Sequence, residues 1–272
     1  MQRAVGVPNL DEYADPHVLV ALALEAERAG WDGFFIWDHL VPEDQSTPAA
    51  DSQVALTAIA AATTRLKVGA MVTPLPRRRP HKVAREMATL QQLTHGRLIF
   101  GAAVGWSREL EYEAFGEDGG ARGDMLDEGL QVLRGLWTGE TFDFTGRHYT
   151  VRGIRFVPGA EIPIWIGGAW PAKRPFRRAA QWDGVFPIIR DAPHEATMPP
   201  ELLREIVAYT LQHRPSHLGV LDVVMEGNSE GDRAALREYK AAGLSWYIEK
   251  LGWWRGGLER VREQIHRGPP ET

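Results

Sequence analysis

Residues 66–105, LKVGAMVTPLPRRRPHKVAREMATLQQLTHGRLIFGAAVG, hold a complete strand–helix–strand unit. Residues 66–73 and 97–105 are short runs rich in apolar and small side chains, which is typical of strands in a core. Between them, residues 80–96 have the apolar spacing of a helix, with a proline at the start and a glycine at the end. This order predicts two parallel strands joined by a helix.

The same alternation extends in both directions along the chain. Further strands are expected at residues 3–8, 33–38, 162–168, 184–188, 221–227 and 244–252, and further helices at 17–30, 51–64, 121–139, 174–182, 199–213, 230–243 and 256–268. Eight strands alternating with eight helices over about 250 residues are typical of a TIM (β/α)8 barrel, an α/β fold. A doubly wound open sheet competes with this fold, but the first strand ends in GVPNL and lacks the Gly-rich turn expected there.

One stretch interrupts the alternation. Residues 142–159, FDFTGRHYTVRGIRFVPG, alternate polar and apolar side chains around a glycine turn. This pattern predicts a hairpin-like insertion between strands 4 and 5 of the barrel, at about residues 140–160. No second domain, low-complexity tract or short repeat is visible, so we expect residues 1–272 to form a single barrel domain.

The composition is that of an ordinary globular chain. Of 272 residues, 44% are hydrophobic and 25% are charged, and the formal net charge is −5. The mild acidity argues against nucleic acid or an anionic membrane as a partner. We expect a cytoplasmic protein, because no apolar run reaches about 18 residues and the first ten lack a signal-peptide core. The absence of cysteine excludes disulfides, thiolate nucleophiles and Cys-bound metals.

In a TIM barrel the functional residues lie where the strands end, on the carboxyl-terminal face. His39 is the most reactive of these, because an imidazole exchanges protons near neutral pH. Asp38 precedes it, although neighbouring strand residues point to opposite faces. The other predicted strand ends supply Asn9, Met71, Val72, Thr73, Gly105, Trp106, Gly167, Gly168, Ile188, Ile189, Arg190, Glu226 and Glu249.

Several of these residues also have a purely structural interpretation. Asp38 can cap a turn while His39 fills the rim, and the glycines at 167–168 form either an anion site or a tight turn. Glu226 and Glu249 raise an alternative function, a non-redox lyase or hydrolase with two carboxylates. The histidines lack metal-binding spacing and no G-x-S-x-G is present, so neither a metal site nor a serine esterase is expected.

Five blocks, residues 29–40, 51–106, 111–151, 163–171 and 177–185, include AGWDGFFIWDHL and PIWIGGAWP. In their order and spacing they resemble the bacterial-luciferase-like (LLM) family of flavin- or deazaflavin-dependent oxidoreductases. The resemblance covers roughly the first 190 residues and is less distinctive beyond them. The fold it implies is a TIM barrel with an insertion.

The resemblance also implies a cofactor site at the end of the barrel. His39 is expected beside the cofactor ring, as a proton donor or as an orienter of the substrate, and Asp38 is expected to support cofactor binding. A bulge with a non-prolyl cis peptide is expected behind the ring, at the end of the third strand. The residues that we expect to bind the cofactor are Asn9, Ala70, Met71, Val72, Thr73, Gly105, Trp106, Gly167, Gly168, Ala169 and Arg190.

The implied activity is hydride transfer to or from a small organic substrate, or its oxygenation, with FMN or coenzyme F-420 (F420) as the cofactor. NAD(P)H or a separate flavin reductase would supply electrons, and a homodimer is expected. One position departs from the pattern: F420-dependent sugar-phosphate dehydrogenases of the family often carry a Glu just after the strand-four glycine, where this chain has Trp106. A tryptophan cannot act as an acid. A non-catalytic flavin-binding barrel is the remaining alternative.

Overall fold

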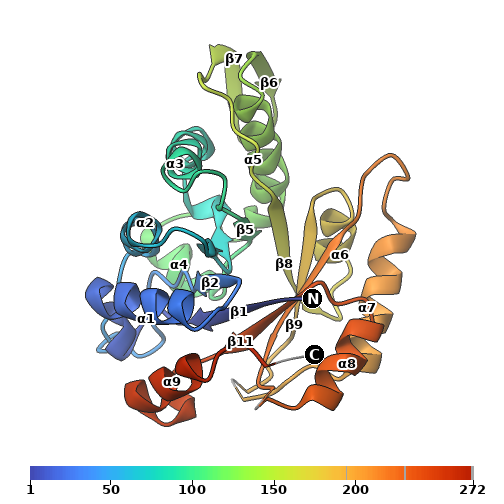
Figure 1. Ribbon diagram of the computed structural model, residues 1–272. Helices are drawn as coiled ribbons and strands as arrows, with labels where there is room; N and C mark the ends of the chain where they lie inside the picture. Colours follow the sequence, from blue (N-terminus) through green and yellow to red (C-terminus); the bar gives the residue numbers. More distant parts are fainter. Residues whose placement is uncertain (194, 230, 271–272) are drawn as a thin grey trace.

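A parallel sheet forms the centre of the molecule and curls until its two ends meet (Figure 1). The computed structural model describes residues 1–193, 195–229 and 231–270. The sheet order is β3-β2-β1-β11-β10-β9-β8-β5-β4, and neighbouring strands are parallel. Its strands are β1 (Gln2–Val7), β2 (Gly33–Ile36), β3 (Lys67–Ala70), β4 (Thr73–Pro74), β5 (Phe100–Ala103), β8 (Ile164–Trp170), β9 (Gly184–Ile189), β10 (Asp222–Gly227) and β11 (Trp246–Lys250).

Helices surround this sheet and cover its outer face (Figure 1). The predicted helices are all present, as α1 (Pro16–Arg28), α2 (Ser52–Ala62), α3 (Pro80–Leu93), α5 (Arg122–Trp137), α6 (Arg174–Ala179), α7 (Pro200–Gln212), α8 (Arg233–Ala241) and α9 (Gly257–His266). The sequence did not predict the short α4 (Arg108–Glu111), nor the 3-10 turns η1 (Asp11–Ala14), η2 (Leu75–Arg77), η3 (Glu113–Phe115) and η4 (Trp253–Arg255). The TIM-barrel prediction is confirmed and the open doubly wound sheet is wrong.

The barrel closes where β3 meets β5. The N–H of Val68 donates to the carbonyl of Arg97 at 3.1 Å, and the N–H of Ile99 donates to the carbonyl of Val68 at 2.9 Å. Glycines make this approach possible. A Cβ at Gly69 would lie 2.2 Å from the carbonyl oxygen of Ile99, and one at Gly101 would lie 2.3 Å from a β3 carbonyl oxygen.

The strand predicted at 66–73 is divided at this seam. β3 ends at Ala70, and β4 resumes at Thr73 and pairs with Ala102 of β5. The peptide bond between Met71 and Val72 is cis, at the position where the family resemblance places such a bond. The division shifts the pairing of the third strand from β2 to β5.

Large side chains fill the inside of the barrel. The rings of Phe35, Trp165 and Trp246 pack against one another, with centroids 5.4 to 6.0 Å apart. The buried residues that complete this inner cluster are Ala4, Met71, Ile99, Phe186, Val224 and Ile248. The larger core lies between the strands and the helices. Because strand residues alternate between the two faces, the inner cluster shows which positions point inward on each strand.

The predicted insertion is a hairpin between α5 and β8. Its strands β6 (Thr141–Thr145) and β7 (Thr150–Arg155) are antiparallel, and Figure 1 shows them projecting beyond the ring of helices. Glu128 of α5 accepts hydrogen bonds from three backbone N–H groups of the hairpin turn, at residues 147–149. The side chain of Phe142 lies against Gly135 of α5, where a Cβ would have no room.

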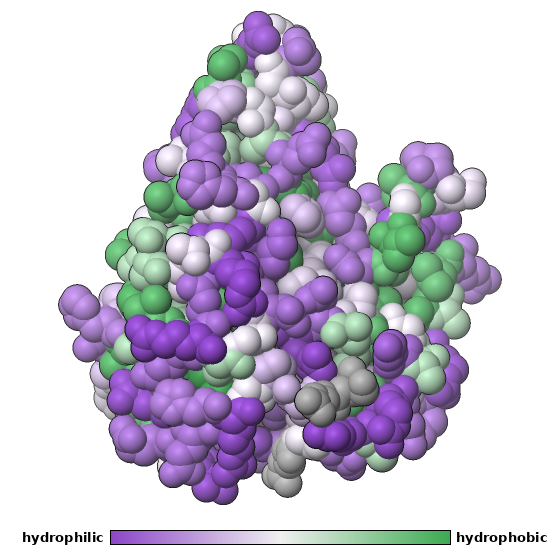
Figure 2. Space-filling model, viewed as in Figure 1, coloured by the Kyte–Doolittle hydropathy of each residue, from purple (hydrophilic) through white to green (hydrophobic). Residues whose placement is uncertain are grey.

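The outer surface is mostly polar. On the face shown in Figure 2, hydrophilic residues predominate and hydrophobic ones form small separate groups. Among the described residues, no helix has both the length and the apolar character needed to cross a membrane.

We expect Gly69→Ala to lower the free energy of unfolding by about 1–3 kcal/mol or more, because the new methyl group meets a backbone carbonyl that closes the barrel. Denaturant unfolding followed by circular dichroism measures the change. Gly219→Ala is the matched control, since a Cβ there meets nothing within 4 Å; its effect should stay within about 0.5 kcal/mol. Equal stability of the two variants would contradict our account of the seam.

Candidate functional site

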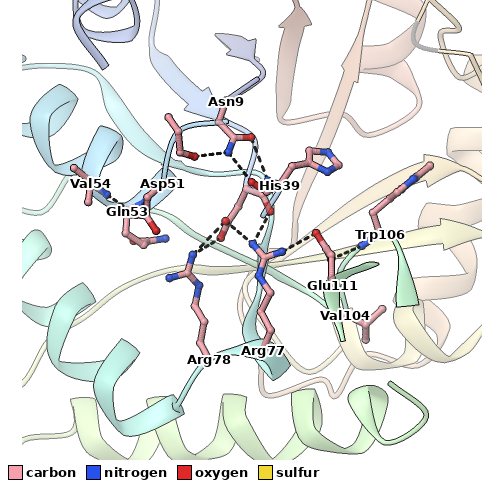
Figure 3. Close-up of polar contacts among 12 residues, drawn as sticks. Asn9, His39, Asp51, Gln53, Val54, Arg77, Arg78, Val104, Trp106 and Glu111 are labelled. Carbon is pink, nitrogen blue, oxygen red and sulfur yellow. Dashed lines mark hydrogen bonds and ion pairs between the residues drawn. The ribbon is translucent and has the colours of Figure 1, made fainter. Parts of the chain in front are cut away.

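The predicted site residues that follow β2 fall into two groups. Trp37, Asp38 and His39 directly follow β2; the rings of Trp37 and His39 are in contact, whereas the carboxylate of Asp38 pairs with Arg77 and Arg78. Figure 3 shows the His39 imidazole pointing away from the side chains of Arg77 and Arg78. Asp38 and His39 therefore have separate surroundings despite being adjacent.

Asn9 fixes the position of His39. The N–H of His39 donates to Asn9 Oδ1 at 3.1 Å, and Asn9 Nδ2 donates to the carbonyl oxygens of His39 (2.9 Å) and Ala50 (2.8 Å). Asn9 is completely buried and its amide is used in these three bonds. The half-buried His39 ring packs edge-on against Trp37, with centroids 5.5 Å apart. The structure thus places Asn9 as a support of His39, and its contact with the cofactor stays a prediction.

Asp38 lies in an ion-pair network within the barrel wall. Its buried carboxylate accepts from Arg77 Nη2 at 2.6 Å and from Arg78 Nη2 at 3.1 Å. Arg77 also pairs with the buried Glu111 at 2.7 Å. The pairs Asp38–Arg77 and Arg77–Glu111 thus connect the end of β2, the turn η2 and the loop after β5 (Figure 3).

Glu111 extends this network to the end of β5. Its Oε2 accepts from the backbone N–H of Trp106 at 3.1 Å, and a Cβ at Gly105 would lie 2.4 Å from the same oxygen. Gly105 also has a φ of 86°, which favours glycine. These contacts give Gly105 a structural role. The Trp106 indole is 52% exposed, and its Nε1–H donates to Glu43 in the loop after β2 at 3.4 Å.

Sequence reasoning missed Arg77 and Glu111. Arg77 lies in the RRR cluster directly after the third strand, on the functional end of the barrel, and this location was the available signal. Glu111 is the last residue of the short helix α4, in a segment of mixed composition, LEYEAF, where no spacing separates it from its neighbours. Its burial comes from the fold.

One side of the barrel end has only small side chains. The inward-facing positions on the upper part of β5 and β8 are Gly101, Ala103, Gly167 and Ala169. Val72, on the cis peptide, lies against them: a Cβ at Gly167 would be 3.0 Å from Val72 Cγ1. The opposite side carries Trp37, Lys250 and Trp254. A wall of glycine and alanine allows a ligand to approach the backbone closely.

Three other residues that were predicted to bind the cofactor, Gly168, Thr73 and Arg190, lie in strands or directly after one. β8 is longer than predicted and runs to Trp170, so residues 167–168 lie inside a strand and form no turn. Gly168 faces outward, and a Cβ there would lie 2.4 Å from Pro175 Cβ of α6. Thr73 is buried within β4. Arg190 follows β9, is exposed, and its N–H donates to the carbonyl of Trp170 at 3.3 Å.

Glu226 and Glu249 do not form a pair of opposed carboxylates. Glu226 faces inward and pairs with Lys250 at 3.1 Å. Glu249 has the opposite orientation, accepts from Ser229 Oγ at 2.5 Å, and lies 3.6 Å from a guanidinium nitrogen of Arg255. The geometry therefore gives no support to the lyase or hydrolase alternative.

Comparisons with known proteins agree with this geometry. The model of the family described as luciferase-like monooxygenase matches residues 3–244. F420-dependent glucose-6-phosphate dehydrogenase 2 of Rhodococcus jostii (strain RHA1) is 35% identical over 179 residues, which cover 62% of this chain and 52% of that protein. F420-dependent glucose-6-phosphate dehydrogenase of Mycobacterium avium (strain 104) is 36% identical over 173 residues, 60% of this chain and 51% of that protein. The chain spans about half the length of these curated relatives.

Solved structures share the fold at low identity. An F420-dependent secondary alcohol dehydrogenase, in complex with an F420-acetone adduct, matches with a TM-score of 0.79 at 16% identity, over 99% of this chain and 98% of that one. The F420-dependent tetrahydromethanopterin reductase of Methanopyrus kandleri matches with a TM-score of 0.75 at 15% identity, over 98% and 97%. These likenesses confirm the barrel fold, and the family model covers most of the sequence. The chain belongs to the luciferase-like monooxygenase family.

Proposed function

We propose that this chain is an oxidoreductase that binds FMN or coenzyme F420 at the carboxyl-terminal end of the barrel and acts on a small organic substrate. The observation that carries the proposal is His39, whose backbone is held by Asn9 just beyond the carboxyl-terminal end of β2, in a chain of this family. The names of the F420-dependent relatives support it, and so do the F420 and FMN complexes among proteins that share the fold.

The residues present fit either cofactor. Val72 and the small side chains of Ala103, Gly167 and Ala169 would lie against the ring system, and the exposed Arg190 would pair with the phosphate that both cofactors carry. When bound, the cofactor supplies the hydride chemistry, or oxygen activation in the case of FMN. We assign no cofactor contact to Asp38 and Gly168, because their surroundings in the wall account for them.

The chain's own contribution is to move a proton and to position groups. We assign to His39 the proton that joins or leaves the substrate during the reaction, since an imidazole is suited to this near neutral pH. Asn9 fixes the backbone of His39, and Trp37 packs against the ring and keeps water from that side. The network of Asp38, Arg77 and Glu111 holds the loops that carry these groups.

Two finer points belong to the same proposal. We infer a homodimer, which light scattering on the purified protein tests directly. We also infer that reducing equivalents come from NAD(P)H or from a separate flavin reductase. Oxidation of NADPH by the cofactor-loaded protein, with and without an added reductase, distinguishes these two sources.

Titration of the apoprotein with FMN and with F420 tests the proposed function. One of the two is expected to bind with one equivalent per chain, which changes the cofactor fluorescence, and the absorption maximum of the complex identifies it. Riboflavin, which lacks the phosphate, should bind more weakly than FMN if Arg190 pairs with that group. Failure of both FMN and F420 to bind would refute the proposal.

The position of His39 gives a second test that needs no substrate. On adding the cofactor that binds, the His39 ring Cε1–H signal in the NMR spectrum should shift, because a ring system placed beside it changes its magnetic surroundings. The signal is assigned by its loss in His39→Gln. His213 is the control: its ring packs on Tyr209 of α7, and its signal should stay unchanged. A shift of His213 without one of His39 would place the cofactor elsewhere.

A further inference from the structure

An ion pair inside the end of the barrel has no part in the proposed mechanism. Val224 and Ile248 belong to the inner cluster, so Glu226 and Lys250, two residues further along β10 and β11, also point inward. Lys250 Nζ lies 3.1 Å from Glu226 Oε1, and the two side chains are only 12% and 15% exposed. The strand ends thus place a donor and an acceptor side by side.

This pair lies close to the proposed site of proton transfer. Lys250 Nζ is 5.5 Å from the ring centroid of Trp37 and 5.8 Å from that of Trp254. These two rings are stacked, with centroids 5.4 Å apart, and Trp37 is also the ring that touches His39. A substrate that reaches the His39 imidazole therefore approaches Glu226 and Lys250 as well.

The charges around this region are balanced in pairs. Arg77 and Arg78 face Asp38, and Arg255 faces Glu249. Lys250, which points inward, is neutralised by Glu226. Among the described cations at these strand ends, the proposed function uses Arg190 as the partner of the cofactor phosphate. A phosphate group on the substrate would therefore be attracted by Lys250 and, at the same time, repelled by the carboxylate of Glu226.

Three large apolar side chains are exposed on the rim of the same end. Leu40, Trp106 and Trp253 are 48%, 52% and 36% exposed, and they come from the loops after β2, β5 and β11. Large apolar side chains exposed together at the end of a barrel favour contact with an apolar ligand. The body of the substrate should accordingly be apolar.

We propose, building on the proposed function, that the substrate is an uncharged alcohol or carbonyl compound with an apolar body, and that Glu226 and Lys250 bind a hydroxyl or carbonyl oxygen of it. The ammonium group donates to that oxygen, and the carboxylate accepts from a hydroxyl. The same carboxylate disfavours phosphorylated substrates, because like charges brought together without water repel strongly. The chain then differs in substrate class from the F420-dependent glucose-6-phosphate dehydrogenases to which it is similar.

Calorimetric binding to the cofactor-loaded protein tests this inference, with cyclohexanol, glucose 6-phosphate and inorganic phosphate as probes. The wild-type protein should bind cyclohexanol more tightly than glucose 6-phosphate. Glu226→Gln keeps the shape and removes the negative charge, so its affinity for inorganic phosphate should rise by roughly tenfold or more. Lys250→Met should weaken cyclohexanol binding without any gain for phosphate.

Glu86→Gln is the matched control. Glu86 pairs with Lys82 at 2.7 Å on the exposed side of α3, so this variant also frees a lysine, but away from the barrel end, and should gain no phosphate affinity. Tighter wild-type binding of glucose 6-phosphate than of cyclohexanol overturns the inference, and so does a phosphate gain in Glu226→Gln no larger than in Glu86→Gln. If a variant fails to fold, the comparison of cyclohexanol with glucose 6-phosphate binding by the wild-type protein still tests the inference. Failure of cofactor binding, measured beforehand, concerns the proposed function instead.

Discussion

The close backbone approach between β3 and β5 is the constraint on which the site depends. Two glycines, Gly69 and Gly101, allow carbonyl groups of the facing strand to occupy the space where a Cβ would stand. Because the sheet closes there, β3 ends early and β4 takes over the pairing with β5. The residues between them, including Val72, are thereby placed against Gly167 of β8. The side of the barrel end with small residues is a consequence of how the barrel closes.

Because side chains alternate in direction along each strand, the two faces of the sheet have different roles. The carboxylates of Asp38 and Glu249 form ion pairs within the wall, and the pair of Asp38 with Arg77 joins segments that are distant in sequence. Lys250 pairs with Glu226 inside the barrel end, and the His39 imidazole points away from Arg77 and Arg78 (Figure 3). A shift of one residue in register would exchange the two sets, so the chemistry depends on the same pairing that builds the fold.

Local patterns in the sequence predicted the main strands and helices of the barrel, but they did not predict the contacts within the site. Helix periodicity and terminal proline and glycine signals predicted the helices, and in the structure Asp51 caps α2, accepting from two backbone N–H groups at 2.9 Å. The partners Arg77 and Glu111 could not be predicted, because their pairing joins loops after different strands. The packing of Gly168 against α6 could not be predicted either, because no motif records that contact.

The proposed substrate contacts lie beyond the sequence blocks that carry the resemblance. The recognisable sequence blocks end near residue 185, and the family model ends at residue 244, before β11 begins. Glu226 and Lys250 lie on the last two strands, yet they face the same region as His39 because a closed barrel brings its first and last strands together through the β1–β11 pairing. The resemblance in the blocks up to residue 185 covers His39 and the two glycines, Gly69 and Gly101, that close the barrel. It therefore carries little information about the charge that the late strands present to a substrate.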